Sequence, residues 1–197
     1  QRQLEGAMLW AQFYAATGDY APAGQALQQA QMLAVAEGDR RCQAQCSNEQ
    51  ATIDWRQGDY AAAQRGYLAA LQLSAGSDDQ LDVQSEAHYG LGLVYRQQSR
   101  YDDARRQFEL ALAASRRLGD RRHEARTLNA LGSLANLQRD YAAAIDLFDD
   151  ALRLRESIGD RAGVGTSLMI LAQVYGNLGD YSRVEPLLQQ ALDIQQA

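Results

Sequence analysis

Cysteine and histidine are the residue types that most often act as nucleophiles, proton carriers or metal ligands, and this sequence has two of each. Cys42 and Cys46 lie about one helical turn apart, with Glu49 next on the same stripe. A structural metal site needs three or four ligands, which this local set does not supply. A disulfide between the two cysteines would strain a helix. We therefore expect both to be small packing residues, and we predict no metal and no cofactor.

The two histidines also lack catalytic partners. His88 precedes the apolar pair Leu91-Gly92, so we expect a packed, hydrogen-bonded side chain. His123 follows Asp120 by three residues and stands among arginines, so we expect a solvated surface group. No serine or cysteine nucleophile forms a recognisable motif with either one. We predict that the protein is not an enzyme and has no catalytic residues.

Charge and composition exclude further classes of function. All 19 basic residues are arginine. The absence of lysine excludes P-loop ATPase, Schiff-base and kinase-type ATP chemistry. The net charge of −6 argues against binding to nucleic acid or to an anionic membrane, and no apolar run is long enough to span a bilayer. Two cysteines form no disulfide framework, so we expect a cytoplasmic protein. Because the chain of 197 residues opens with Gln, we expect a segment of a longer protein.

The elements that position these residues are predicted to be helices. Alanine and leucine supply 60 residues, whereas valine, isoleucine and threonine supply only 15. Helices favour alanine and leucine, and strands favour β-branched residues. The composition therefore predicts an all-α protein.

A repeat of about 40 residues divides the chain. The tripeptide Gly18-Asp19-Tyr20 returns as Gly58-Asp59-Tyr60 and Gly179-Asp180-Tyr181, with weaker copies ending at Tyr101 and Tyr141. The five tyrosines are spaced 40, 41, 40 and 40 residues apart. An aspartate follows 19 residues after each of the first four tyrosines: Asp39, Asp79, Asp120 and Asp160.

Glycine and aspartate at these points predict the end of one helix and the start of the next. Glycine accepts the left-handed conformation at a helix C-terminus, and aspartate accepts hydrogen bonds from the next helix's first N–H groups. Each repeat is therefore predicted to be a helix pair within a single domain. The predicted repeats are 1–38, 39–78, 79–119, 120–159 and 160–197, with the extra residue of the third repeat in the loop 77–80.

Alignment on the tyrosines predicts how the helices pack. Small residues recur nine positions before the repeat tyrosine and three and ten positions after it. Larger residues recur seven positions after it. The pattern Leu131-Gly132, Tyr141, Ala144, Phe148 and Ala151 resembles the tetratricopeptide repeat, and the 40-residue spacing is similar to kinesin light chain and bacterial multi-repeat regulators. The resemblance covers essentially the whole chain. It implies a right-handed helical solenoid of five antiparallel pairs, whose first helices line a concave groove that binds proteins or peptides.

The same resemblance implies which side chains face that groove. The positions are rich in amides, which pair with a peptide backbone, and in arginine, which pairs with carboxylates. We expect an extended, acidic-leaning peptide, with Arg96 and Arg126 on its carboxylates and Tyr89 and Trp55 on its apolar groups. The candidate groove residues are Asn48, Trp55, Arg56, Tyr89, Arg96, Arg126, Asn129, Ser133, Asn136, Met169, Gln173 and Asn177.

Three questions remain open at this level. The chain could be an interaction scaffold, which we favour, or the ligand-sensing domain of a larger regulator. Gln50 and Asp54 stand where neighbouring repeats have apolar or aromatic residues, so they belong either to a degenerate repeat, which we favour, or to a binding site. The last helix still presents Leu188 and Leu192 near its end at Ala197, which predicts that the chain continues or self-associates end to end.

Overall fold

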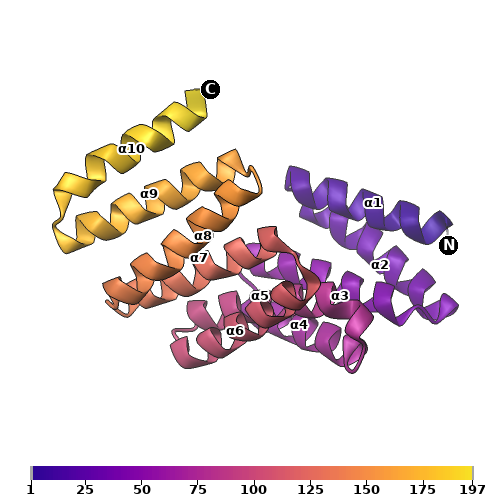
Figure 1. Ribbon diagram of the computed structural model, residues 1–197. Helices are drawn as coiled ribbons and strands as arrows, with labels where there is room; N and C mark the ends of the chain where they lie inside the picture. The colour runs from indigo at the N-terminus through magenta and orange to yellow at the C-terminus, as the bar shows by residue number, and fades with distance from the viewer. Residues whose placement is uncertain (1, 197) are drawn as a thin grey trace. The chain divides into compact units, whose positions relative to one another are not determined.

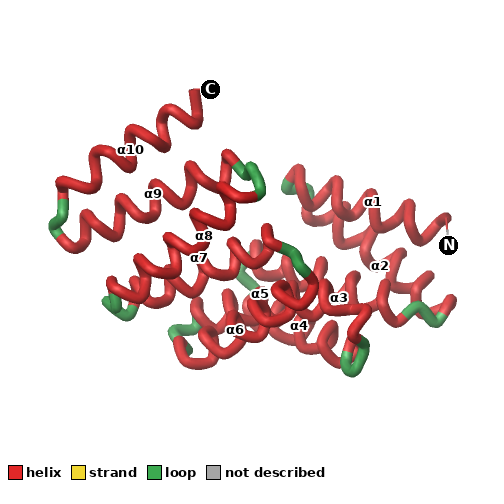
Figure 2. The backbone as a smooth tube through the Cα atoms, viewed as in Figure 1, coloured by secondary structure: helices red, strands yellow, loops and turns green. Residues whose placement is uncertain are grey.

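The computed structural model describes residues 2–196, and this part of the chain is helical throughout, with short turns between helices (Figures 1 and 2). It contains no strand within those residues, so the predicted all-α class is confirmed. The helices are α1 (Arg2–Thr17), α2 (Tyr20–Glu37), α3 (Arg40–Arg56), α4 (Tyr60–Ser74), α5 (Leu81–Gln97), α6 (Tyr101–Leu118), α7 (Arg121–Leu137), α8 (Tyr141–Ser157), α9 (Arg161–Leu178) and α10 (Tyr181–Gln196), with a 3-10 turn η1 (Asp78–Gln80) before α5.

The ten helices form five antiparallel pairs, from α1 with α2 to α9 with α10, as the repeat predicts. Contacts divide the chain into an N-terminal unit, residues 1–114, and a C-terminal unit, residues 115–197. Each unit has apolar cores of its own. Tyr67 and Leu91 are buried in the N-terminal unit, and Phe148 and Leu171 are buried in the C-terminal unit.

The turns follow the predicted glycine and aspartate chemistry. Gly38 ends α2 with a φ of 68°, the left-handed conformation that glycine adopts without steric cost. Asp39 then accepts a hydrogen bond from the backbone N–H of Cys42 at 2.9 Å. Asp120 and Asp160 cap α7 and α9 in the same way. The predicted helix boundaries at these turns are therefore confirmed.

Asp79 departs from this pattern, and the prediction that it begins a helix as the other three aspartates do is wrong. It lies inside η1, and Gln80 occupies the N-cap position of α5 without a side-chain cap. The N–H of Gln80 bonds to the carbonyl of Ser77 at 3.1 Å, which tightens the chain into a 3-10 turn. This turn takes up residues 78–80, within the loop predicted to hold the extra residue.

Small residues let the two helices of a pair approach closely. A Cβ atom placed on Gly92 would lie 2.4 Å from the Cε1 atom of Phe108, and one on Gly132 would lie 2.8 Å from Cε1 of Phe148. Both phenylalanines are fully buried. Each ring thus fills the space that the missing glycine side chain leaves, which confirms the predicted packing.

Candidate binding surfaces

Helix α9 presents the predicted residues to solvent. Met169, Gln173 and Asn177 recur every four residues, so they lie along one face of the helix, and all three are exposed. Other faces of α9 pack against α8 and α10. The result is an open row of one thioether and two amides on a helix that its neighbours hold in place.

Asn129 has a different environment. It is 8% exposed, and its side-chain oxygen accepts hydrogen bonds from both terminal nitrogens of Arg155, at 3.0 and 3.1 Å. Arg155 also donates to the carbonyl of Gly163 at 2.6 Å and to the hydroxyl of Ser167 at 3.0 Å. The Asn129 side chain therefore joins α7, α8 and α9, and this internal role occupies the oxygen that a peptide backbone would need.

The other predicted residues of α7 are half-buried. The hydroxyl of Ser133 donates to the backbone carbonyl of Asn129 at 2.8 Å. The Nη2 atom of Arg126 lies 3.2 Å from the Nε2 atom of His123. Asn136 has a buried side-chain oxygen that accepts no hydrogen bond. His123 is thus half-buried against an arginine, so the expectation of a solvated surface group is corrected.

In the N-terminal unit, Asn48 is also used internally. It is 5% exposed, and its amide donates to the carbonyl of Val83 at 2.9 Å, which links α3 to α5. Trp55 is half-buried, with an indole N–H that has no acceptor. Arg56 is exposed and donates to the carbonyl of Ala15 at 3.1 Å.

On α5, both predicted groove residues are half-buried. The ring of Tyr89 packs against that of Phe108, with 5.7 Å between the ring centres, so it is partly committed to the α5–α6 contact. Arg96 is the next-to-last residue of the helix, which ends at Gln97. His88, on the same helix, is paired as expected, because its Nδ1 atom is 2.8 Å from the side-chain oxygen of Gln107.

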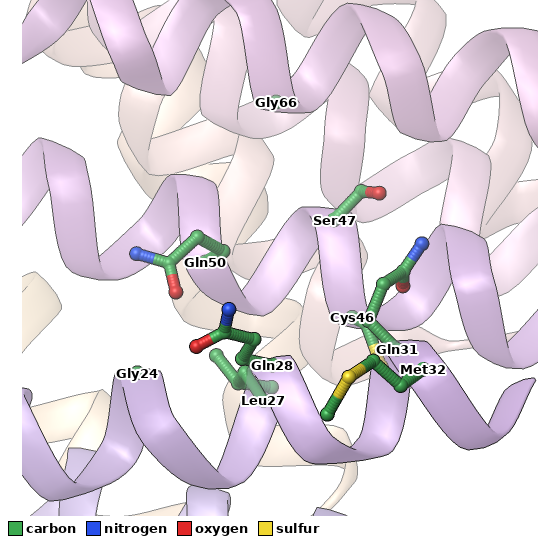
Figure 3. Close-up of a pocket in the computed structure, with 9 residues that line it drawn as sticks. All are labelled: Gly24, Leu27, Gln28, Gln31, Met32, Cys46, Ser47, Gln50 and Gly66. Carbon is green, nitrogen blue, oxygen red and sulfur yellow. The ribbon is translucent and has the colours of Figure 1, made fainter.

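Two polar side chains of α3, those of Gln50 and Asp54, are hydrogen-bonded to each other. The amide of Gln50 donates to the carboxylate of Asp54 at 2.9 Å, one turn along the same helix. Gln50 also borders a cavity of about 500 Å³ formed by α2, α3 and α4 (Figure 3). The lining has no charged side chain and is made by Gly24, Leu27, Gln28, Gln31, Met32, Cys46, Ser47, Gln50 and Gly66.

A second cavity, of about 540 Å³, lies between α1 and α3 and is acidic. Glu49 stands at its edge, and burial, with the nearby charge of Glu86, raises the pKa of this carboxyl, while Arg56 opposes the rise. The lining is Leu4, Glu5, Met8, Leu9, Gln12, Asp39, Cys42, Gln45 and Glu49.

Helix α1 carries an aromatic surface that the sequence reasoning missed. Leu9, Trp10 and Phe13 are 67%, 59% and 55% exposed. The ring of Trp10 stacks on that of Tyr14 at 5.6 Å and meets the edge of Phe13 at 5.9 Å. The signal that could have predicted this surface is the occurrence of three aromatic residues, Trp10, Phe13 and Tyr14, within five positions.

Two structural features are absent from residues 2–196. No group of three histidine, cysteine, aspartate or glutamate side chains is arranged to hold a metal ion there. None of the helices there combines the length and apolar character that a membrane crossing requires.

Comparison with known proteins identifies the repeat. Residues 83–157 and 125–197 match one family profile described as tetratricopeptide repeat, and residues 48–117 match a second profile of the same description. Together they span residues 48–197, most of the chain. A search of curated proteins finds no match.

Solved structures with the same fold come from several kinds of protein. Aspartyl phosphate phosphatase F from Bacillus subtilis has a TM-score of 0.85 at 15% identity, with 98% of this chain and 51% of that chain covered. A Signal Transduction ATPase with Numerous Domains from Pyrococcus horikoshii has a tetratricopeptide repeat sensor. It matches with a TM-score of 0.84 at 16% sequence identity, with 95% of this chain and 28% of that chain covered. A putative kinesin light chain from Podosopora anserina matches with a TM-score of 0.71 at 16% sequence identity, with 98% of this chain and 94% of that chain covered. The chain thus spans about half of the first protein and under a third of the second.

Proposed function

The chain belongs to the tetratricopeptide repeat family, and we propose that it is a non-enzymatic scaffold that binds an extended segment of a partner protein through the first helices of its repeats. The exposed row Met169, Gln173 and Asn177 on α9 is the observation on which the proposal rests. The proposed setting is a reducing cytoplasm, where free thiols such as those of Cys42 and Cys46 persist.

The chemistry of the row suits a peptide in extended conformation. An amide side chain both donates and accepts hydrogen bonds, so Gln173 and Asn177 can pair with the N–H and the carbonyl of one peptide unit. Met169 is 42% exposed, and its flexible thioether adapts to apolar side chains of different shapes. The row therefore favours the backbone and shape of a segment over a single sequence.

The arginines suggest the charge of the partner segment. Arg56 is exposed on α3 and Arg96 is half-buried on α5, both in the N-terminal unit. Guanidinium groups form paired, charge-assisted hydrogen bonds with carboxylates. We therefore propose an acidic-leaning segment at Arg96, whereas the acidic cavity beside Glu49 would repel such a segment.

The test compares two surfaces of matched composition. A partner is first isolated by affinity capture, and its binding segment is then titrated against purified variants. The triple variant Met169→Ala, Gln173→Ala, Asn177→Ala is expected to bind at least about tenfold more weakly, because it loses the apolar contact and the backbone hydrogen bonds together.

The control variant changes one methionine and two amides that are exposed on the second helix α2: Gln25→Ala, Gln29→Ala and Met32→Ala. It is expected to bind as the unmodified protein does. Equal losses for the two variants, or a loss for the control alone, would place the partner on another surface and contradict the proposal.

A second function, ligand sensing, is favoured by the uncharged cavity between α2, α3 and α4. Its volume of about 500 Å³ suits a small molecule, and one matched structure contains a tetratricopeptide repeat sensor within a larger ATPase. Discovery of an ATPase or DNA-binding region in the same polypeptide would favour sensing over the scaffold.

A further inference from the structure

Three sulfur atoms from two helices converge in the N-terminal unit. The Sγ atom of Cys46 on α3 lies 3.3 Å from the Sδ atom of Met8 on α1, across 38 residues of sequence. Cys42 stands one helical turn before Cys46, and both belong to one buried cluster against which Met8 packs. The third sulfur is the ligand that the sequence could not supply, because Met8 approaches only when α1 folds against α3.

The two cysteines are buried and Met8 is partly buried, and each of the three borders a cavity. Cys42 and Cys46 are 7% and 3% exposed. Cys42 and Met8 border the acidic cavity between α1 and α3, and Cys46 borders the uncharged cavity formed by α2, α3 and α4 (Figure 3). An ion entering the acidic cavity would meet two of the three sulfur atoms directly.

We propose that Cys42, Cys46 and Met8 bind one Cu(I) ion, with two thiolates and one thioether as ligands. Thiolate and thioether are soft ligands, which prefer soft cations such as Cu(I) to Mg²⁺ or Ca²⁺. Zinc sites use cysteine, histidine and carboxylate, and the described residues hold no cluster of three such groups. The geometry of the cluster thus favours a soft monovalent ion.

Binding involves proton release without redox change. Each thiol loses its proton to water as its sulfur bonds to the ion, so two protons leave and copper stays in the +1 state. Glu5 on α1, Glu37 at the end of α2, and Asp39 and Glu49 at α3 surround the cluster, and their charges would draw a cation toward it.

The first experiment titrates the reduced full chain with Cu(I) against a chromophoric Cu(I) chelator. We expect one ion per chain and ultraviolet thiolate-to-copper absorption. Cys42→Ala and Cys46→Ala are each expected to weaken binding by about a hundredfold, and Met8→Leu, which keeps the side-chain volume, by about tenfold. Circular dichroism confirms that each variant remains helical.

The matched control is Met32→Leu, because Met32 borders the same uncharged cavity as Cys46 but does not border the acidic cavity that Met8 and Cys42 line. It is expected to bind Cu(I) as the unmodified chain does. Equal effects of Met8→Leu and Met32→Leu, or no effect of Met8→Leu, would overturn the three-sulfur site. So would binding that persists unchanged in both cysteine variants.

The second experiment measures the apparent affinity as a function of pH. Release of two protons predicts an increase of about a hundredfold per pH unit below the thiol pKa values. A pH-independent affinity would overturn the proposal, because it would show that the thiols do not become thiolates.

Discussion

At the scale of single residues, sequence position predicted the face of a helix but not the depth of a side chain. Asn48 and Asn129 lie at predicted inner positions, yet each is buried and hydrogen-bonded to a neighbouring helix. A buried amide needs partners, and Val83 and Arg155 supply them from helices far along the chain. Met169 has the same predicted role and is exposed. Periodicity alone could not distinguish these cases.

Glycine illustrates the same dependence on neighbours, and a pair of substitutions tests it. A Cβ atom on Gly90 would lie 2.2 Å from the Cζ atom of Tyr67, whereas one on Gly6 would meet nothing within 4 Å. We expect Gly90→Ala to lower the free energy of unfolding by about 1–3 kcal/mol through overpacking. Gly6→Ala should raise it by about 0.5–1 kcal/mol, because alanine favours a helix interior. Urea denaturation measures both, and a stabilising Gly90→Ala would refute the close packing.

His88 predicts a pH dependence of stability. Burial lowers its pKa, and the hydrogen bond to Gln107 opposes this only in part. A folded pKa below the unfolded value gives stability that is present above the unfolded pKa, about 6.5, and is lost as pH falls through the folded pKa. The variant His88→Gln has no imidazole to protonate, so it does not lose this folding stability as the pH falls. Its destabilisation relative to the unmodified chain should therefore be largest near about pH 7.5 and shrink toward about pH 5. Denaturation at several pH values measures it, and a growing difference would contradict the assignment.

At the scale of helices, the boundaries were largely predictable because each depends on local chemistry. Glycine in the left-handed conformation followed by a capping aspartate ends one helix and starts the next within two residues. Ser99 and Arg139 adopt the same conformation, with φ of 59° and 63°, where other repeats have glycine. The repeat spacing thus indicated turns even where the glycine is missing. The start of α5 was not predictable in this way, because one extra residue replaced the cap by a 3-10 turn.

A comparison of two aspartates tests this difference. Asp120 accepts a hydrogen bond from the backbone N–H of His123 at 2.9 Å, so Asp120→Ala should cost about 0.5–2 kcal/mol of folding stability. Asp79 caps no helix with its side chain, and Asp79→Ala should cost less than about 0.5 kcal/mol. Thermal denaturation of the two variants gives both values. Equal losses would mean that Asp79 stabilises α5 in a way the turn geometry does not explain.

At the scale of the whole molecule, the repeat predicted the number and pairing of the helices but not the cavities or the sulfur cluster. The tyrosine spacing repeats in every copy, so packing rules apply to all five pairs. The cavity between α2, α3 and α4 arises where copies differ, since Gly24 and Gly66 border it and other repeats carry larger residues there. The contact of Met8 with Cys46 likewise depends on a cysteine that no other repeat has at that position. The uncharged cavity and the sulfur cluster therefore both lie at positions where one repeat differs from the others.

The last helix predicts self-association of the whole chain. Tyr181, Leu188 and Leu192 are 73%, 47% and 45% exposed on α10 and border a hollow of about 330 Å³. Burying this apolar surface against a second copy would remove it from water. Leu188→Gln with Leu192→Gln should weaken self-association at least about tenfold, or 1.4 kcal/mol, in sedimentation equilibrium. The matched pair Leu110→Gln and Leu118→Gln on α6, 48% and 46% exposed, should leave it unchanged. A chain that stays monomeric at high concentration, or equal weakening by both pairs, would show that α10 is not the contact surface.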